Sequence, residues 1–222
     1  MANDATMKTA LVLGGSGLIG RMLIDELLAS GHYGKVTALL RKELSAAPAE
    51  LDQQIVDFES LLTEQLPLVA DDVFCCLGTT QKTVGGDKDK FYRIDHDYPV
   101  ELAKLAQAGG AKRCFVVSAT GANSKSRFYY NRVKGDMERD LKTLGFDALH
   151  IYQPSLLIGS REHLDQLNRG GEFVGQKLMP LMNPFLQGSL RKFRPTHATA
   201  VAQAMCADSG RDSRGVEIHH FE

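Results

Sequence analysis

The stretch Leu11-Val-Leu-Gly-Gly-Ser-Gly-Leu-Ile-Gly20 decides the fold. It holds four glycines in ten residues, directly after an apolar run that begins near Thr9. Three of these glycines have the spacing GxxGxxG, and apolar residues then recur at helical spacing as far as Leu28. The pattern predicts a buried strand, a tight turn and an amphipathic helix.

Glycine at such a turn leaves room for a pyrophosphate beside the N-terminus of the following helix. The free N–H groups and the dipole of that helix favour negative charge, and the last glycine lets the helix pack closely on the strand. We therefore predict a dinucleotide-binding turn and not merely a flexible loop. The residues expected to contact the cofactor here are Gly14, Ser16, Gly17, Leu18, Ile19, Gly20 and Arg21.

Composition and charge limit the classes of function that this chain can have. The chain has 222 residues, 43% of them hydrophobic and 24% charged, which predicts one domain over residues 1–222. A formal net charge of −1 gives no case for nucleic acid or an anionic membrane as a partner, and the short basic patches at 125–127 and 191–194 are interpreted as solvated faces. Residues 1–10 lack an apolar leader and no apolar run approaches about 18 residues, so we expect a cytoplasmic protein.

Metal binding is not predicted. The four cysteines lack CxxC or Cys/His metal spacing and are expected to be buried, reduced thiols. Residues 215–222 alternate like a strand, so His219 and His220 are expected to face opposite sides. This argues against joint metal ligation, and we interpret the two histidines as a terminal, solvent-facing pair.

Strands alternate with helices as far as residue 153. The expected strands span 9–13, 35–41, 54–57, 72–77, 112–118 and 147–153, and the expected helices span 18–30, 58–64, 92–108 and 126–144. This alternation predicts an α/β fold, a doubly wound and mostly parallel sheet with helices on both faces.

Regularity fades after Pro154. Residues 154–222 are expected to contribute a small substrate or lid region, with an irregular segment at 159–193. Its apolar part, 173–185, is interpreted as a lid over the pocket or as a surface for a protein partner. A helix is expected at 195–207, with Thr196 as its N-cap, before the final strand.

The end of the second predicted strand bears on the choice of cofactor. An NAD-specific fold commonly has Asp or Glu there, to accept hydrogen bonds from the ribose 2′-OH, whereas this chain has Leu40-Arg41-Lys42. A guanidinium at Arg41 would pair with a 2′-phosphate, so NADP(H) is favoured over NAD(H), and Arg21 would add a second positive group. Asp57 and Phe58, after the third strand, are expected to contact the adenine.

A tyrosine and a lysine stand one helical turn apart, at Tyr130 and Lys134, and are expected on one helix face. Such a pair also arises by chance, but this one follows the strand that ends at Ser118, at the sheet edge where open α/β folds bind ligands. A nearby ammonium favours phenolate, so Tyr130 would move a proton to or from a carbonyl or hydroxyl oxygen during hydride transfer. Ser118 would hydrogen-bond the same oxygen, and Lys134 would also bind ribose hydroxyls.

The combination of these motifs resembles the short-chain dehydrogenase/reductase superfamily, in its extended or atypical branch. Four stretches are similar to the Tat-interacting, tumour-suppressor oxidoreductase group: Val56-Asp-Phe-Glu59, Cys75-Cys-Leu-Gly-Thr-Thr80, Tyr130-x-x-x-Lys134-Gly135 and Gln153-Pro-Ser-Leu-Leu-Ile-Gly-Ser-Arg161. The resemblance implies a Rossmann sheet that binds NADP(H). It also implies that Leu77, Gly78 and Thr79 pass the cofactor, and that Pro154 to Ile158, with Leu156 among them, line the nicotinamide.

The same resemblance implies Tyr130 as general acid/base, Lys134 as its activator and Ser118 as the donor that positions a carbonyl. Asp95 departs from the pattern, because extended members usually have there an Asn used in helix shaping and proton relay. A carboxylate would either serve that relay or disable it. The sequence thus predicts an NADP(H)-dependent oxidoreductase for a small carbonyl or alcohol; the alternative is an NADP(H)-binding regulatory or partner-binding protein without turnover.

Overall fold

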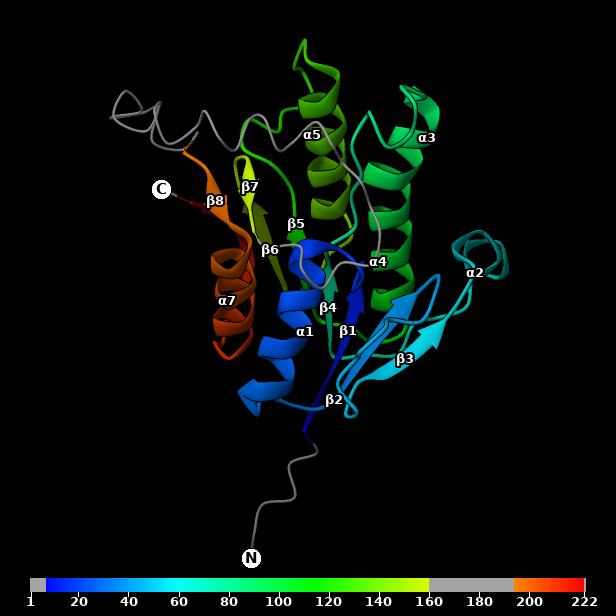
Figure 1. The fold of residues 1–222 in the computed structure, drawn as a ribbon, viewed down its shortest axis with the longest axis vertical. Coiled ribbons are helices and arrows are strands. Elements are labelled where there is room, and N and C mark those ends of the chain that lie inside the picture. Colours follow the sequence, from blue (N-terminus) through cyan, green and yellow to red (C-terminus); the bar gives the residue numbers. More distant parts are fainter. Residues whose placement is uncertain (1–6, 160–193, 222) are drawn as a thin grey trace, which may run out of the picture.

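The computed structural model describes residues 7–159 and 194–221, in which a large parallel sheet lies between two layers of helices (Figure 1). The sheet has seven strands in the order β3-β2-β1-β4-β5-β6-β9, and all neighbouring strands are parallel. The order reverses between β1 and β4, where open α/β sheets bind ligands beyond the carboxyl ends. The strand bounds are β1 Lys8–Leu13, β2 Tyr33–Leu40, β3 Asp52–Ile55, β4 Asp72–Cys75, β5 Arg113–Val117, β6 Ala148–Gln153 and β9 Gly215–His220.

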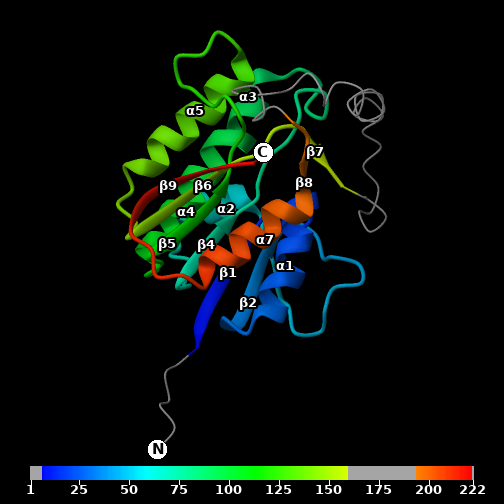
Figure 2. The same ribbon diagram turned by 90° about the vertical axis from the view of Figure 1, so that its left-hand side faces the viewer.

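Helices cover both faces of the sheet (Figure 2). On one face lie α1 (Leu18–Ser30) and α7 (Ala198–Ser209), and on the other lie α2 (Phe58–Glu64), α4 (Tyr98–Ala108) and α5 (Tyr129–Lys142). Each strand feeds alternate residues to the two layers: in β1, Ala10 and Val12 pack under α1 and α7, whereas Leu11 and Leu13 pack under the opposite helices. The predicted α/β, doubly wound class is confirmed.

Two elements differ from their predictions in ways that matter for the site. The helix expected at 92–108 starts earlier, as α3 (Lys88–Tyr92), and passes through a π-helical turn, η1 (Arg93–Asp97), before α4 begins. Asp87 ends the preceding loop by capping α3, because its side chain accepts a hydrogen bond from the Lys90 N–H. The helix expected at 126–144 is the shorter α5.

The C-terminal part also differs. Thr196 is not the N-cap of α7, which is His197, because Thr196 belongs to a short strand β8 (Thr196–His197) that pairs with β7 (Leu157–Ile158). His219 is not solvent-facing, since its ring stacks on Tyr152 with centroids 4.5 Å apart. The predictions for the segment 160–193, including the lid or partner surface at 173–185, fall outside the described residues. Of the helices that are described, none combines the length and apolar character that crossing a bilayer requires.

The turn between β1 and α1 needs its glycines for space. Gly14 has φ of +83°, and a Cβ there would lie 2.7 Å from the carbonyl carbon and oxygen of Cys76, which follows β4. A Cβ on Gly20 would overlap the carbonyl oxygen of Gly14. The first turn of α1 therefore rests directly on the backbone of the turn that precedes it.

We expect Gly20→Ala to lower the free energy of unfolding by about 3 kcal/mol, because the added methyl meets backbone that cannot move away. Gly31→Ala is the control: Gly31 has φ of +70° with nothing within 4 Å of the added atom, so only backbone strain of about 1 kcal/mol is expected. Urea unfolding of both variants measures the difference. Equal losses would show that the space around Gly20 is not what requires glycine.

Candidate cofactor and active site

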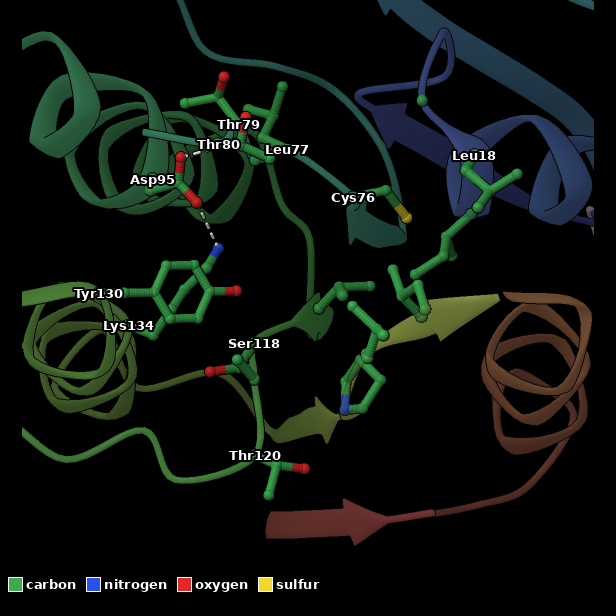
Figure 3. Close-up of a pocket in the computed structure, with 18 of the residues that line it drawn as sticks. Leu18, Cys76, Leu77, Thr79, Thr80, Asp95, Ser118, Thr120, Tyr130 and Lys134 are labelled. Carbon is green, nitrogen blue, oxygen red and sulfur yellow. Dashed lines mark hydrogen bonds and ion pairs between the residues drawn. The ribbon is translucent and has the colours of Figure 1, made fainter. Parts of the chain in front are cut away.

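A pocket of about 590 Å³ opens at the carboxyl ends of the central strands (Figure 3). It is built from the β1–α1 turn, the segments that follow β4, β5 and β6, and one face of α5. The predicted site residues that line it are Gly17, Leu18, Ile19, Leu77, Gly78, Thr79, Ser118, Tyr130, Lys134, Pro154 and Leu156. The fold therefore brings to one pocket predicted site residues that are far apart in the chain.

The N-terminus of α1 is open to an anion. Its N-cap is Gly17, and within the described residues no side chain caps this terminus and no acidic residue lies in its first turn. The N–H groups of the first turn are among those that a helix leaves without internal partners. Together with the space that Gly14 and Gly20 leave, this terminus fits the pyrophosphate of a dinucleotide. Ser16 is exposed on the same turn.

The arginines predicted to contact a 2′-phosphate lie beyond the pocket. Arg41 is exposed, directly after the end of β2. Arg21 is held by the loop between β2 and β3, because its guanidinium donates to the carbonyl oxygens of Ser45 at 3.0 Å and Ala46 at 2.6 Å. Arg21 therefore anchors the loop that follows Arg41.

The two residues predicted to contact the adenine have structural roles. Asp57 caps α2 by accepting a hydrogen bond of 2.8 Å from the Glu59 N–H. Phe58 is buried, and its ring packs edge-on against Tyr98 at 5.4 Å between centroids. Neither residue lines the pocket.

A buried ion pair joins three segments at the pocket wall. The Lys134 ammonium lies 2.9 Å from Asp95 Oδ1, and the two side chains are 4% and 1% exposed. Asp95 Oδ2 accepts a hydrogen bond of 2.8 Å from the Thr79 N–H. Gly78 passes so close that a Cβ there would lie 3.3 Å from Asp95 Oδ1. The carboxylate of the π-helical turn thus ties α5 to the loop after β4.

This pair changes the acidity expected for the tyrosine. Burial alone would lower the pKa of Lys134, but the Asp95 carboxylate raises it above its ordinary value. The pKa of Tyr130 is also raised above its ordinary value, because burial and Asp95 together outweigh the opposing effect of Lys134. The ammonium does lower the pKa of Tyr130, as expected, but it does not make Tyr130 more acidic than an ordinary phenol, so the hydroxyl is protonated at neutral pH. Figure 3 shows its hydroxyl directed into the pocket.

Sequence reasoning missed Glu138. The Ser118 hydroxyl donates to Glu138 Oε1, and the Gln153 side chain donates to the same oxygen at 2.8 Å. All three side chains belong to residues that are at least nine-tenths buried. A signal was present, because Tyr130, Lys134 and Glu138 follow one another at four-residue spacing and so share one face of α5.

The cysteines are free thiols, as predicted, with three buried and Cys76 partly buried. Cys75 packs in the layer of α4 and α5, and Cys76 packs against the layer of α1, so the adjacent side chains do face opposite sides. Burial raises the pKa of Cys75 to about 11. A neutral thiol is a poor nucleophile, which agrees with a packing role.

We expect Asp95→Asn to lower the free energy of unfolding by about 3 kcal/mol, because it leaves the buried Lys134 ammonium without its counter-charge. Asp97→Asn is the matched control in the same turn; its side chain is 31% exposed, so a loss below about 1 kcal/mol is expected. Urea unfolding at neutral pH compares the two. In a Lys134→Met background the cost of Asp95→Asn should shrink, and an unchanged cost would argue against the ion pair.

Comparison with known proteins agrees with this geometry. Residues 14–178 match the NAD(P)H-binding family. Protein HTATIP2 of Rattus norvegicus is 37% identical over 174 residues, which cover 77% of this chain and 69% of that protein. FMP52, mitochondrial, of Eremothecium gossypii is 36% identical over 153 residues, which cover 69% of this chain and 68% of that protein.

The relatives overturn the expected cytoplasmic location. FMP52 proteins from four species, among them Eremothecium gossypii and Saccharomyces cerevisiae, are each named mitochondrial. The prediction rested on finding no apolar leader, a test that detects secretory signals, whereas mitochondrial transit peptides are amphipathic. The lack of an apolar leader therefore does not argue against a mitochondrial location.

A solved structure shares the fold. MoeE5 in complex with UDP-glucose and NAD superposes with a TM-score of 0.69 at 19% identity, over 95% of this chain and 74% of that one. Other structures of similar fold are nucleotide-sugar epimerases. Taken with the glycine turn and the pocket, these matches show that the chain belongs to the NAD(P)H-binding family, as a homologue of the HTATIP2 and FMP52 proteins with a Rossmann-like α/β fold.

Proposed function

We propose that this chain is an NADP(H)-dependent oxidoreductase that transfers hydride to or from a small carbonyl or alcohol. One observation carries the proposal: the open N-terminus of α1 and the side chains of Ser118, Tyr130 and Lys134 converge on one pocket. Family membership supports the nucleotide. When bound, the nicotinamide supplies or accepts the hydride, and the residues of this chain handle the proton.

Tyr130 is the proton-exchanging residue in this proposal. Its hydroxyl is directed into the pocket, and its raised pKa keeps it protonated at neutral pH. It therefore suits the reduction direction, in which the Oη proton moves to the oxygen of a carbonyl substrate. The Lys134 ammonium then lies near the phenolate that this transfer leaves, and stabilises it.

The hydrogen bond from Ser118 to Glu138 limits how Ser118 can bind the substrate oxygen. A hydroxyl has one proton, and that of Ser118 goes to Glu138. Donation to a substrate carbonyl requires the Ser118 hydroxyl to rotate away from Glu138. An alcohol substrate brings its own proton, so it meets Ser118 Oγ as an acceptor without that rotation. Glu138 is thus a positioning residue for Ser118.

The preference for NADP(H) over NAD(H) rests on the end of β2. The structure leaves the Arg41 side chain exposed there and fixes the following loop through Arg21. A 2′-phosphate beside Arg41 would gain a charge-assisted hydrogen bond that the 2′-OH of NAD cannot make.

One observation favours a second function, NADP(H) binding without turnover. Both groups that would assist chemistry are already paired with carboxylates, Lys134 with Asp95 and Ser118 with Glu138. If those pairs hold when cofactor binds, the pocket binds and does not react. Titration with NADPH, followed by a screen of small aldehydes, ketones and quinones, separates the two functions: turnover supports the oxidoreductase, and tight binding without turnover supports the regulatory or partner-binding protein.

We expect Tyr130→Phe to lower the rate of NADPH oxidation at least about 100-fold while NADPH affinity stays within about threefold. The change removes the proton donor and keeps the ring. Tyr129→Phe is the matched control, because the neighbouring Tyr129 hydroxyl donates to the Lys88 carbonyl and does not line the pocket. Steady-state rates and calorimetric titration measure both effects. Full activity in Tyr130→Phe would remove this residue from the mechanism.

We expect Arg41→Asp to reduce the ratio of NADPH affinity to NADH affinity at least about tenfold, because a carboxylate repels a 2′-phosphate and accepts from a 2′-OH. Arg214→Asp makes the same change of charge just before β9, the strand at the opposite edge of the sheet. It should leave the ratio of NADPH affinity to NADH affinity unchanged. Calorimetric titration of both variants with both cofactors gives the ratio. If the two variants gave the same ratio, Arg41 would not be the determinant.

A further inference from the structure

Imidazole and carboxylate groups gather on β6 and β9, away from the pocket. His150 lies on β6 and pairs in register with Glu217 on β9, while Tyr152 pairs with His219. Because side chains alternate along a strand, His150, Glu217 and His219 share the face that α7 covers. None of the three lines the pocket.

The spacing of the three groups suits a metal ion. His150 Nδ1 lies 3.0 Å from His219 Nε2 and 3.9 Å from Glu217 Oε2, and the three atoms all lie within 4.8 Å of one another. Ligand atoms bound to tetrahedral zinc at about 2.1 Å are about 3.4 Å apart. The two imidazoles are already close to that spacing, and the Glu217 side chain, 34% exposed, has room to turn inward.

The outward nitrogens of both histidines already have partners. His150 Nε2 lies 2.8 Å from Ser213 Oγ, and His219 Nδ1 lies 3.6 Å from Asp208 Oδ2. The Tyr152 hydroxyl donates to that same Asp208 oxygen at 2.9 Å. Histidines that bind metals usually hydrogen-bond their second nitrogen to a carboxylate or another oxygen, which fixes the ring and its tautomer; the His150 contact has that length, and the His219 contact is longer.

The surrounding charges permit a cation. An imidazole binds a metal through a nitrogen that carries no proton. Arg211 is the nearby positive group: its guanidinium lies 3.5 Å from Glu217 Oε2 and 2.5 Å from Asp208 Oδ1. Its side chain is 56% exposed, so it can swing toward solvent when Glu217 turns to a metal.

We propose that His150, Glu217 and His219 bind one divalent ion of the zinc class, with water as the fourth ligand. Two imidazoles and a carboxylate form a ligand set that zinc accepts. Since the ligands come from two strands, the ion would clamp the edge strand β9 onto β6. The alternation along β9 argues against joint ligation by His219 and His220, whereas His150, the second imidazole of the proposed site, comes from the neighbouring strand β6.

The test uses the full chain after treatment with a chelator. Zn²⁺ titrated in a calorimeter should bind at one equivalent with a Kd of about 1 μM or below, and 100-fold excess over Kd should raise Tm by about 5 °C. His219→Gln should weaken binding at least about tenfold. His220→Gln is the matched control: it changes the adjacent, exposed histidine on the other face and should bind as the wild type does.

Three results would overturn the proposal: no Zn²⁺ binding by the wild type, equal affinity in wild type and His219→Gln, or loss of binding in His220→Gln. If circular dichroism shows that His219→Gln does not fold, Glu217→Gln decides instead, with weaker binding supporting the site and unchanged binding refuting it. NADPH titration of the same variants should be unchanged, so this test stands apart from the proposed oxidoreductase activity.

Discussion

The contact between Gly20 and the carbonyl oxygen of Gly14 is the constraint on which the rest of the structure depends. It fixes how α1 leaves β1, and so where the open N-terminus of α1 points. Gly14 in turn admits the backbone of Cys76, which brings the segment after β4 beside that terminus. A side chain at either glycine would separate these segments, because the atoms it would meet are backbone. The pocket follows from this packing.

The buried pair of Asp95 and Lys134 is the second constraint, and it acts on chemistry as well as on position. It joins the π-helical turn to α5, and the Thr79 N–H adds the loop after β4. Burial raises the pKa of Tyr130 above its ordinary value; Lys134 acts in the opposite direction, and the Asp95 carboxylate adds to the rise. Asp95 thus contributes, after burial, to keeping the Tyr130 hydroxyl protonated.

The features that could be predicted from sequence are those with a local signal. Examples are the GxxGxxG turn, the alternation of strands and helices, and the spacing of Tyr130 and Lys134. Each is a pattern within a short continuous stretch of sequence. The features that were missed depend on neighbours that are remote in sequence. Thr196 belongs to β8 and not to the start of α7 because it pairs with β7. The hydrogen bond from Ser118 to Glu138 depends on how α5 packs beside the end of β5. Local periodicity carries no information about such partners.

The charge on the α5 side of the pocket bears on how an anionic cofactor could be held. The charge of Lys134 is balanced by Asp95, and Glu138 adds a buried carboxylate held by Ser118 and Gln153. The wall formed by α5 therefore offers no net attraction to a pyrophosphate. The attraction must come from the free N–H groups and dipole at the start of α1, where no acidic side chain of the first turn competes. In the proposed function, the backbone at the start of α1 therefore holds the pyrophosphate, and the side chains on the opposite wall handle the proton.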